Sequence, residues 1–414
     1  MVIDATMEET RSLAYRFKQR LYYGTRRLLR ALGLRAIAPT RAGAAVARRL
    51  RVRPRVTEDL AAWSHAHGFD CVVLSPAQTR ARRAPIALDN ALHPNFARHL
   101  AAQIAERFMV CLPQARVWGA NGLVILPDGS FASQAIYDRR HLEADPAYST
   151  PTPAHVVRKD GDYVTLLGEF SNTSNYYHWV HDGLLRLHGV HSHLPSNVKY
   201  LVPSPLYDHQ RETLHLLGFR DEQLVPFTGS SVWECERLWF PSLPPSGAEV
   251  PDAVSWLRER FWAAAGVERA EPRRRFYLSR KGAEHARVVN EAELVPVLDT
   301  HGFEVIQPER MSVADQVRLF AQAEAIVSAT SAGLTNLLFA GRETKNLEIL
   351  EPEWAARKAF VVWTLAETLD QSFWYLTAET APNPERPKRA DLHVPAITLE
   401  RALGRWLSPA DEGP

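Results

Sequence analysis

Apolar positions between residues 276 and 350 alternate between helical and strand spacing. Asn290 followed three residues later by Glu293 predicts a capping box at the start of a helix. The apolar residues after it recur every three or four positions, as they do in a helix. Strands separated by helices of this length are typical of right-handed βαβ units, so the stretch predicts a parallel sheet. The predicted elements are helices after Asn290 and from Ser312, and strands at 276–278, 303–306, 325–327 and 347–350.

The rest of the chain has a weaker pattern, and a Pro-rich join at residues 241–251 divides it. Before the join, Pro127-Asp128-Gly129 predicts a hairpin between apolar runs at 122–126 and 131–136. The last predicted helix, 399–407, is expected to pack back on the N-terminal half. The expected organisation is a basic helical extension (1–55), a first α/β domain (56–250) and a second α/β domain (251–414).

Residues 159–162, Lys-Asp-Gly-Asp, lie between two further strand-like runs. Asp160 and Asp162 have the Asp-x-Asp spacing that can hold a divalent ion against a sugar diphosphate. However, Asp-Gly between two strands is first of all a hairpin signal. The turn is therefore the favoured interpretation, and no metal site is predicted.

The small residues 331–336 follow a predicted strand and lead into an apolar run. Backbone N–H groups at such a turn can bind phosphate, and Gly333 lets the backbone approach closely. Ser331, Thr335 and Asn336 add neutral donors. The alternative is an ordinary α/β half-domain in which the turn merely caps a helix.

Charged residues at two other predicted strand ends fit a ligand that carries phosphate and ribose groups. Arg280 and Lys281 follow the strand at 276–278 and can neutralise a diphosphate. Glu348 and Glu351 lie on and after the last strand of the region, where a carboxylate can accept hydrogen bonds from ribose hydroxyls.

His178 and Asp182 are four residues apart in a predicted helix and so project from one face. Either group could remove a proton from an attacking hydroxyl. Taken alone, such a pair is more often a contact on a helix surface.

Net charge is +2, but residues 1–55 hold 14 Lys and Arg against 3 Asp and Glu, which gives +11 there and −9 elsewhere. A basic amphipathic helix with interleaved Tyr and Leu suits an anionic membrane surface. A solvated helix or disordered arm is the open alternative. No nucleic-acid-binding motif accompanies the charge, so no nucleic-acid partner is predicted.

Cysteine usage and hydropathy indicate a cytoplasmic setting. Cys71, Cys111 and Cys235 are too far apart for a disulfide framework or zinc site. The chain has no run of eighteen apolar residues and no apolar signal region near its start. The expected location is the cytoplasm, with the inner face of the cytoplasmic membrane as the site of any peripheral binding.

Two stretches resemble glycosyltransferase family 61 and bacterial proteins of capsular polysaccharide biosynthesis. One runs from Ser279-Arg280-Lys281 to Leu347-Glu348-Ile349-Leu350-Glu351-Pro352. The other matches the family's Asn-Tyr-Tyr-His-Trp…Asp/Glu segment through Asn175, Tyr177, His178, Trp179 and Asp182. The family usually carries His-Gly-Ala-Gly-Leu-Thr-Asn at the small-residue turn, and this chain has Thr330 in place of that His.

The resemblance implies two Rossmann-like domains facing a cleft, the GT-B arrangement, and inverting transfer of a sugar to a glycan or glycolipid hydroxyl. A UDP-sugar is the expected donor, with no cofactor and no obligatory metal. Asp182 is the expected base, oriented or replaced by His178, and Asn175, Tyr177 and Trp179 are expected on the acceptor side. The departure at Thr330 motivates an alternative, a non-catalytic glycan- or nucleotide-binding protein of the same fold.

Overall fold

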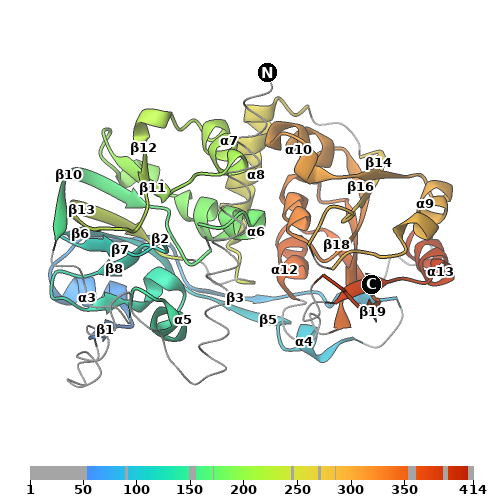
Figure 1. Ribbon diagram of the computed structural model, residues 1–414, viewed down its shortest axis with the longest axis horizontal. Helices are drawn as coiled ribbons and strands as arrows, with labels where there is room; N and C mark the ends of the chain where they lie inside the picture. Colours follow the sequence, from blue (N-terminus) through green and yellow to red (C-terminus); the bar gives the residue numbers. More distant parts are fainter. Residues whose placement is uncertain are drawn as a thin grey trace.

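A computed structural model describes residues 54–408 except for 89–91, 149–154, 171, 244–246, 269–271, 285, 353–359 and 386–389. The predicted basic extension, 1–55, lies outside the described residues apart from Pro54 and Arg55. Two lobes lie side by side, an N-terminal lobe (residues 54–241) and a C-terminal lobe (residues 251–408), with helix α8 (Pro251–Ala265) at their junction (Figure 1).

The N-terminal lobe is built on a ten-stranded mixed sheet of order β1-β9-β8-β7-β13-β10-β11-β12, with β6 pairing β13 and β2 pairing β6. Strands β10 to β13 are parallel where they pair, whereas β6 and β7 run antiparallel to β13. The strands are β1 (Val56–Thr57), β2 (Cys71–Ser75), β6 (Arg107–Pro113), β7 (Arg116–Trp118), β8 (Leu123–Ile125), β9 (Phe131–Ala132), β10 (Val156–Thr165), β11 (Lys199–Pro203), β12 (Leu224–Phe227) and β13 (Val232–Pro241). The helices include α3 (Leu60–Ala66), α5 (Arg139–Ala144) and α7 (Asp208–Leu216).

The C-terminal lobe is built on a six-stranded sheet of order β15-β14-β16-β17-β18-β4, in which every pairing is parallel. This confirms the parallel α/β arrangement predicted from residues 276–350. The strands are β14 (Arg274–Leu278), β15 (Phe303–Ile306), β16 (Ala323–Ala329), β17 (Lys345–Leu350) and β18 (Ser372–Thr377), and a separate pair is β19 (Glu379–Ala381) and β20 (Asp391–His393). The helices are α9 (Glu291–Thr300), α10 (Val313–Phe320), α12 (Phe360–Thr368) and α13 (Ala396–Trp406).

An arm of the chain before residue 105 crosses to the C-terminal lobe (Figure 1, cyan). It comprises the paired strands β3 (Gln78–Ala81) and β5 (Ala101–Ile104), edge strand β4 (Ile86–Ala87) and helix α4 (Pro94–Ala97). The Phe96 ring packs against Trp363 and Tyr375, with centroids 5.5 and 4.9 Å apart. Residues of the expected first domain therefore complete the second sheet, and the division at residue 250 stays a prediction.

The largest hydrophobic core is continuous across the two lobes. It joins Val164 and Trp179 of the N-terminal lobe to Phe276 and Leu337 of the C-terminal lobe, and all four are at most 1% exposed. Burial of this kind stabilises by about 25 cal/mol for each Å² of apolar surface removed from water. The lobes therefore share one packed interior.

Three local predictions need correction. β10 is one continuous strand rather than a hairpin at 159–162, because a bulge absorbs Asp160 and Gly161 opposite one residue of β13. Asn290 precedes helix α9, but its side chain donates to Val394 O (2.8 Å) and makes no capping bond. The last helix, α13, packs against α9 in the C-terminal lobe, where Trp406 stacks on Phe303, and not on the N-terminal half.

The second aspartate of the Asp-x-Asp pattern has a structural partner. Both Asp162 oxygens accept from the Arg237 guanidinium at 2.7 and 2.8 Å, and the Trp239 indole donates to one of them at 2.9 Å. These hydrogen bonds outweigh the effect of burial and hold the pKa of Asp162 below its ordinary value. The hairpin around Pro127-Asp128-Gly129 is present between β8 and β9, although the second strand ends at Ala132.

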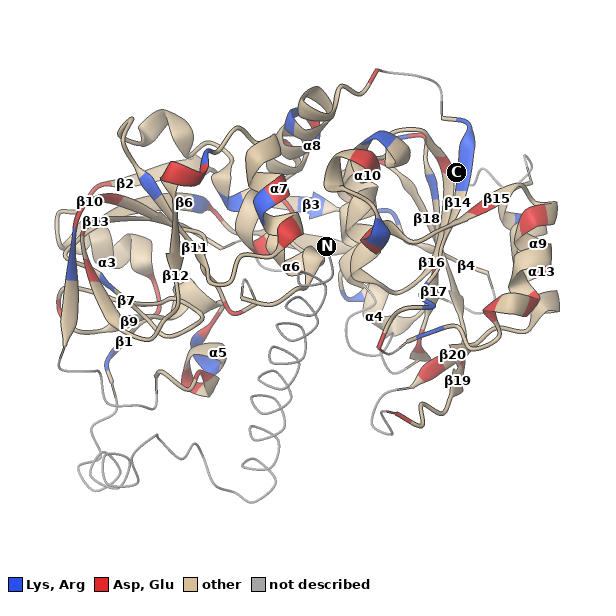
Figure 2. Cartoon of the chain, turned by 45° about the horizontal axis from the view of Figure 1, so that its top comes forward, with Lys and Arg blue, Asp and Glu red and all other residues tan. Residues whose placement is uncertain are grey.

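Basic and acidic residues are interspersed over both lobes rather than gathered on one face (Figure 2). Within the described part of the chain, no helix is both long and apolar enough to cross a bilayer.

Candidate active site

The His178 segment changes helix type within one turn. Helix α6 (Tyr176–His178) runs into the π-helical turn η2 (Trp179–Gly183) and then the 3-10 turn η3 (Leu184–Leu187). Asn175 lies at the N-cap of α6, and its side chain accepts a hydrogen bond from His178 N at 3.4 Å. Single π-helical turns are often found at functional sites. The apolar pattern predicts only a helix here, since hydrogen-bond register is not visible in a periodicity.

His178 and Asp182 form the pair that the spacing predicts. Nδ1 of His178 lies 2.7 Å from Oδ2 of Asp182, with side chains 15% and 6% exposed. The hydroxyl of Tyr137 donates to the same Oδ2. The second oxygen, Oδ1, is buried and accepts no hydrogen bond within the described part of the chain. Both side-chain hydrogen bonds of Asp182, from His178 and from Tyr137, are therefore made by Oδ2.

Aromatic residues hold the imidazole of His178 on two sides. Phe170 stacks on the ring with centroids 4.2 Å apart and planes inclined by 25°. Tyr177 meets it edge-on at 5.3 Å. The ring is thus fixed by packing as well as by its hydrogen bond to Asp182.

Tyr137 belongs to the site but is not predicted by the sequence. It ends the 3-10 turn η1 (Ser133–Ile136) with φ of 70°, a conformation that costs a non-glycine residue on the order of 1–3 kcal/mol. Burial, followed by the negative charge of Asp182, raises the pKa of its phenol, so the group stays a hydrogen-bond donor. No pattern near residue 137 links it to a helix that starts nearly forty residues later.

A second buried histidine–carboxylate contact lies behind the first. Nδ1 of His181 is 3.6 Å from Oε1 of Glu249, and both side chains are buried. Oε1 also accepts from the hydroxyl of Thr364 on α12, at 3.3 Å. Burial lowers the pKa of His181, so its ring is neutral near pH 7. Through Glu249 and Thr364, the contact links η2 to α12 of the C-terminal lobe.

The fully buried guanidinium of Arg186 lies near the Asp182 carboxylate. Arg186 donates to the backbone oxygens of Pro241 and Leu167 at 2.8 to 3.1 Å. Burial lowers its pKa to about 9, and the nearby Asp182 charge favours its protonated form. At neutral pH Arg186 is therefore still a cation.

The small-residue turn of the C-terminal lobe contacts α6 directly. It forms the 3-10 helix η7 (Ala332–Phe339), which follows β16 at the carboxyl end of the parallel sheet. A Cβ placed on Gly333 would lie 3.7 Å from Leu278 at the end of β14 and 3.8 Å from Pro308 after β15. Three strand ends thus meet at this turn. In Figure 1, α6 lies on the side of the N-terminal lobe that faces the C-terminal lobe.

Residues 176–347 match the family model of Glycosyltransferase 61. The matched region begins at the first residue of α6 and ends within β17, so it includes both the His178–Asp182 pair and η7. A search of curated proteins finds no match. This match supports a transferase that uses a sugar donor and an acceptor.

Two of the four predicted turn residues point inward. Thr335 and Asn336 are buried, and Nδ2 of Asn336 donates to Oε1 of Gln316 on α10 at 2.7 Å. Ser331 and Gly333 are half-buried and remain at the surface of the turn. Trp179 is likewise fully buried and donates to the Thr213 hydroxyl at 2.7 Å. These inward residues support the backbone from within the core.

The predicted cations lie on the loop after β14. Arg280 is half-buried, and its Nε donates to Ala286 O at 2.9 Å. Burial lowers its pKa, opposed by the charge of Glu309 just after β15. Lys281 is exposed. Both residues lie at the edge of the sheet that carries η7, because the carboxyl ends of parallel strands share one edge.

Glu348 and Glu351 occupy different environments. Glu348 on β17 is buried, and its Oε1 accepts from the hydroxyl of Thr330 at 2.7 Å. Burial raises its pKa to about 8, so the group is mainly neutral at pH 7. Glu351 lies just beyond the strand and is half-buried. Of the two, only Glu351 has a surface position from which a ligand hydroxyl can be bound.

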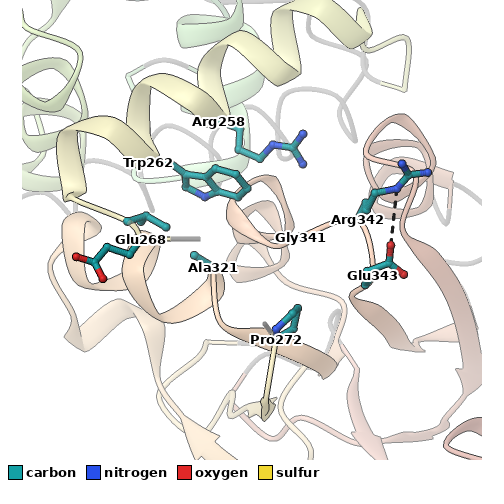
Figure 3. A pocket seen from close by; sticks show the side chains of 9 residues that line it. Arg258, Trp262, Glu268, Pro272, Ala321, Gly341, Arg342 and Glu343 are labelled. Atoms are coloured by element: carbon teal, nitrogen blue, oxygen red, sulfur yellow. Dashed lines mark ion pairs between the residues drawn. The ribbon is translucent and has the colours of Figure 1, made fainter. Parts of the chain in front are cut away.

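A cavity of about 310 Å³ lies away from this site, beside the end of α8 (Figure 3). Trp262, Ala321 and Pro272 line it, with Arg258 and Arg342 at its rim. None of the candidate site residues lines this cavity. The candidate site is identified by its hydrogen bonds and by the strand ends that meet there, and not by the volume of a cavity.

Proposed function

We propose that the protein is an inverting glycosyltransferase that moves a sugar from a nucleotide-sugar to a hydroxyl of a surface polysaccharide or glycolipid precursor. One observation carries the proposal: helix α6, with the His178–Asp182 pair beside it, contacts the turn η7 at the carboxyl end of a parallel sheet. Ligands of open α/β sheets bind at that edge. A proton acceptor and a phosphate-binding turn are therefore neighbours.

The donor binds on the C-terminal lobe. The leaving diphosphate is stabilised by the Arg280 and Lys281 cations and by the turn at Ser331 and Gly333, with no obligatory metal. Glu351 accepts hydrogen bonds from the ribose, and a UDP-sugar is the donor that we propose. Thr335, Asn336 and Glu348 act indirectly, since their buried side chains shape the turn and the strand beneath it.

The acceptor binds beside α6. Inversion requires one base to remove the hydroxyl proton while the oxygen attacks the anomeric carbon in line with the departing diphosphate. The His178–Asp182 pair supplies that base. Asn175 is exposed and Tyr177 half-buried, so both have surface positions beside the pair, whereas Trp179 supports them from the core.

We also propose that transfer takes place in the cytoplasm, at the inner face of the membrane. The charge of +11 on residues 1–55 supports this, because anionic lipids attract clusters of Lys and Arg by about 1 kcal/mol per residue.

A panel of nucleotide-sugars tests the activity. The protein should release UDP from one or more UDP-sugars, and mass spectrometry should find the sugar on an added glycan or glycolipid acceptor. Inverted anomeric configuration in the product, read by NMR, should accompany transfer. A protein that binds UDP tightly but turns over no nucleotide-sugar with any acceptor would instead be the non-catalytic binding protein.

A further inference from the structure

The two members of the His178–Asp182 pair differ in whether an acceptor hydroxyl can reach their polar atoms. Oδ2 of Asp182 already accepts from His178 and Tyr137, and Oδ1 is buried. His178 is the more exposed partner, and its Nε2 makes no hydrogen bond within the described part of the chain. A general base must come within hydrogen-bond reach of the proton that it removes. The reachable atom is therefore Nε2.

The hydrogen bonds also determine which nitrogen of the His178 imidazole carries the proton. An ionised carboxylate can only accept hydrogen bonds, so the proton between His178 and Asp182 belongs to Nδ1. In the neutral ring, Nε2 then carries the free lone pair. A buried carboxylate that fixes an imidazole in one tautomer and stabilises the cation formed later is the arrangement of histidine bases in hydrolases.

We propose that Nε2 of His178 accepts the proton of the acceptor hydroxyl, and that Asp182 and Tyr137 are positioning residues. The proposal rests on the glycosyltransferase function above and reverses the sequence-based preference for Asp182 as the base. As the acceptor oxygen bonds to the anomeric carbon, its proton passes to Nε2. The bond from that carbon to the diphosphate breaks, and its electron pair leaves with the diphosphate. The imidazolium that forms is stabilised by Asp182.

Tyr137 has a defined part in this arrangement. Its hydroxyl donates to Oδ2 and so fixes the oxygen that holds the His178 ring. Tyr137→Phe should retain the ring packing but lose this donor, and the carboxylate can then rotate. The expected effect is about a tenfold fall in kcat with little change in KM, because one hydrogen bond to a charged group is lost. Unchanged kcat in a folded Tyr137→Phe variant removes Tyr137 from the proposal.

Kinetics of matched variants separate the two candidate bases. His178→Ala should lose about a hundred- to ten-thousand-fold in kcat while UDP affinity is retained, and added imidazole should restore part of the rate. Imidazole should restore nothing to Asp182→Asn. His191→Ala, at an exposed histidine on the next 3-10 turn, is the control. If His178→Ala keeps most of its rate while Asp182→Asn is inactive, Asp182 is the base and the proposal fails.

A spectroscopic test does not depend on turnover. In protein labelled with ¹⁵N-histidine, the neutral ring of His178 should show a protonated Nδ1 and an unprotonated Nε2, assigned by comparison with His178→Gln. A protonated Nε2 would overturn the proposal even if the protein transfers sugar. Conversely, the expected tautomer in a protein that turns over no donor would leave the pair intact and contradict only the glycosyltransferase function.

Discussion

Glu348 should make the stability of the protein fall as pH rises through neutrality. Its carboxyl group is buried on β17 with a pKa of about 8, against an ordinary value near 4.5. Between these values the unfolded chain releases the proton and the folded protein keeps it. The folded state then binds more protons than the unfolded state, and stability decreases with pH. The stability is fully present below the unfolded pKa and is lost as pH approaches 8.

The magnitude follows from the width of that interval. One pKa unit corresponds to about 1.4 kcal/mol, so raising the pH from about 5 to about 7.5 should cost the wild type roughly 3 kcal/mol through this group. Glu348→Gln keeps an oxygen for the Thr330 hydroxyl but cannot titrate. Its buried amide N–H groups gain no obvious acceptor, so a constant penalty of about 1–3 kcal/mol is expected at every pH.

Urea unfolding followed by tryptophan fluorescence measures the difference between the two proteins. Glu348→Gln should be the less stable protein near pH 5 and should equal or exceed the wild type near pH 7.5. The test is how the difference in stability between the two proteins changes with pH, because other titrating groups are common to both proteins. Glu343→Gln, at an exposed position, should follow the wild type throughout. Parallel pH curves for wild type and Glu348→Gln would refute the assignment of a neutral buried carboxyl.

Three other predictions concern ligands. Arg280→Ala should weaken UDP binding by about 1.5–3 kcal/mol by calorimetry, since a charge-assisted hydrogen bond is lost; unchanged affinity would remove Arg280 from the site and leave Lys281 as the alternative. The protein should co-sediment with anionic rather than neutral vesicles, more weakly in high salt, and deletion of residues 1–55 should abolish this while UDP binding persists; equal binding to both vesicle types would contradict it. Asp160→Asn should leave turnover unchanged, because Asp160 lies in a strand bulge, and a large loss would revive the Asp-x-Asp metal interpretation.

The C-terminal sheet was predictable because its signals are local. Ser312 accepts from Asp315 N at 3.1 Å at the start of α10, as its type and position indicate, and β15, β16 and β17 occur where the apolar runs are. The His178–Asp182 contact is equally local, since four residues in a helix return the chain to the same face.

The features that sequence reasoning missed depend on distant contacts. Asp160 and Gly161 form a bulge because β13 lies alongside, and the sequence of one strand cannot show its partner. Tyr137 reaches Asp182 through the tertiary fold, and Asn290 donates to the distant Val394 O instead of capping the backbone of its own helix. Burial of Thr335 and Asn336 similarly depends on α10 and the surrounding core, which no local pattern shows.

The continuous core also bears on how the base meets the donor turn. Had the lobes been joined only by a linker, the alignment of His178 with η7 would depend on domain closure. Instead, Trp179 and Leu337 belong to one core, and His181 reaches Glu249, which is bonded to Thr364 of α12. The segment that carries the proposed base is thus tied by apolar packing and by a polar contact to the lobe that carries the turn. Their relative position is set by folding, so the acceptor that we propose would enter beside α6 rather than through a gap opened between independent domains.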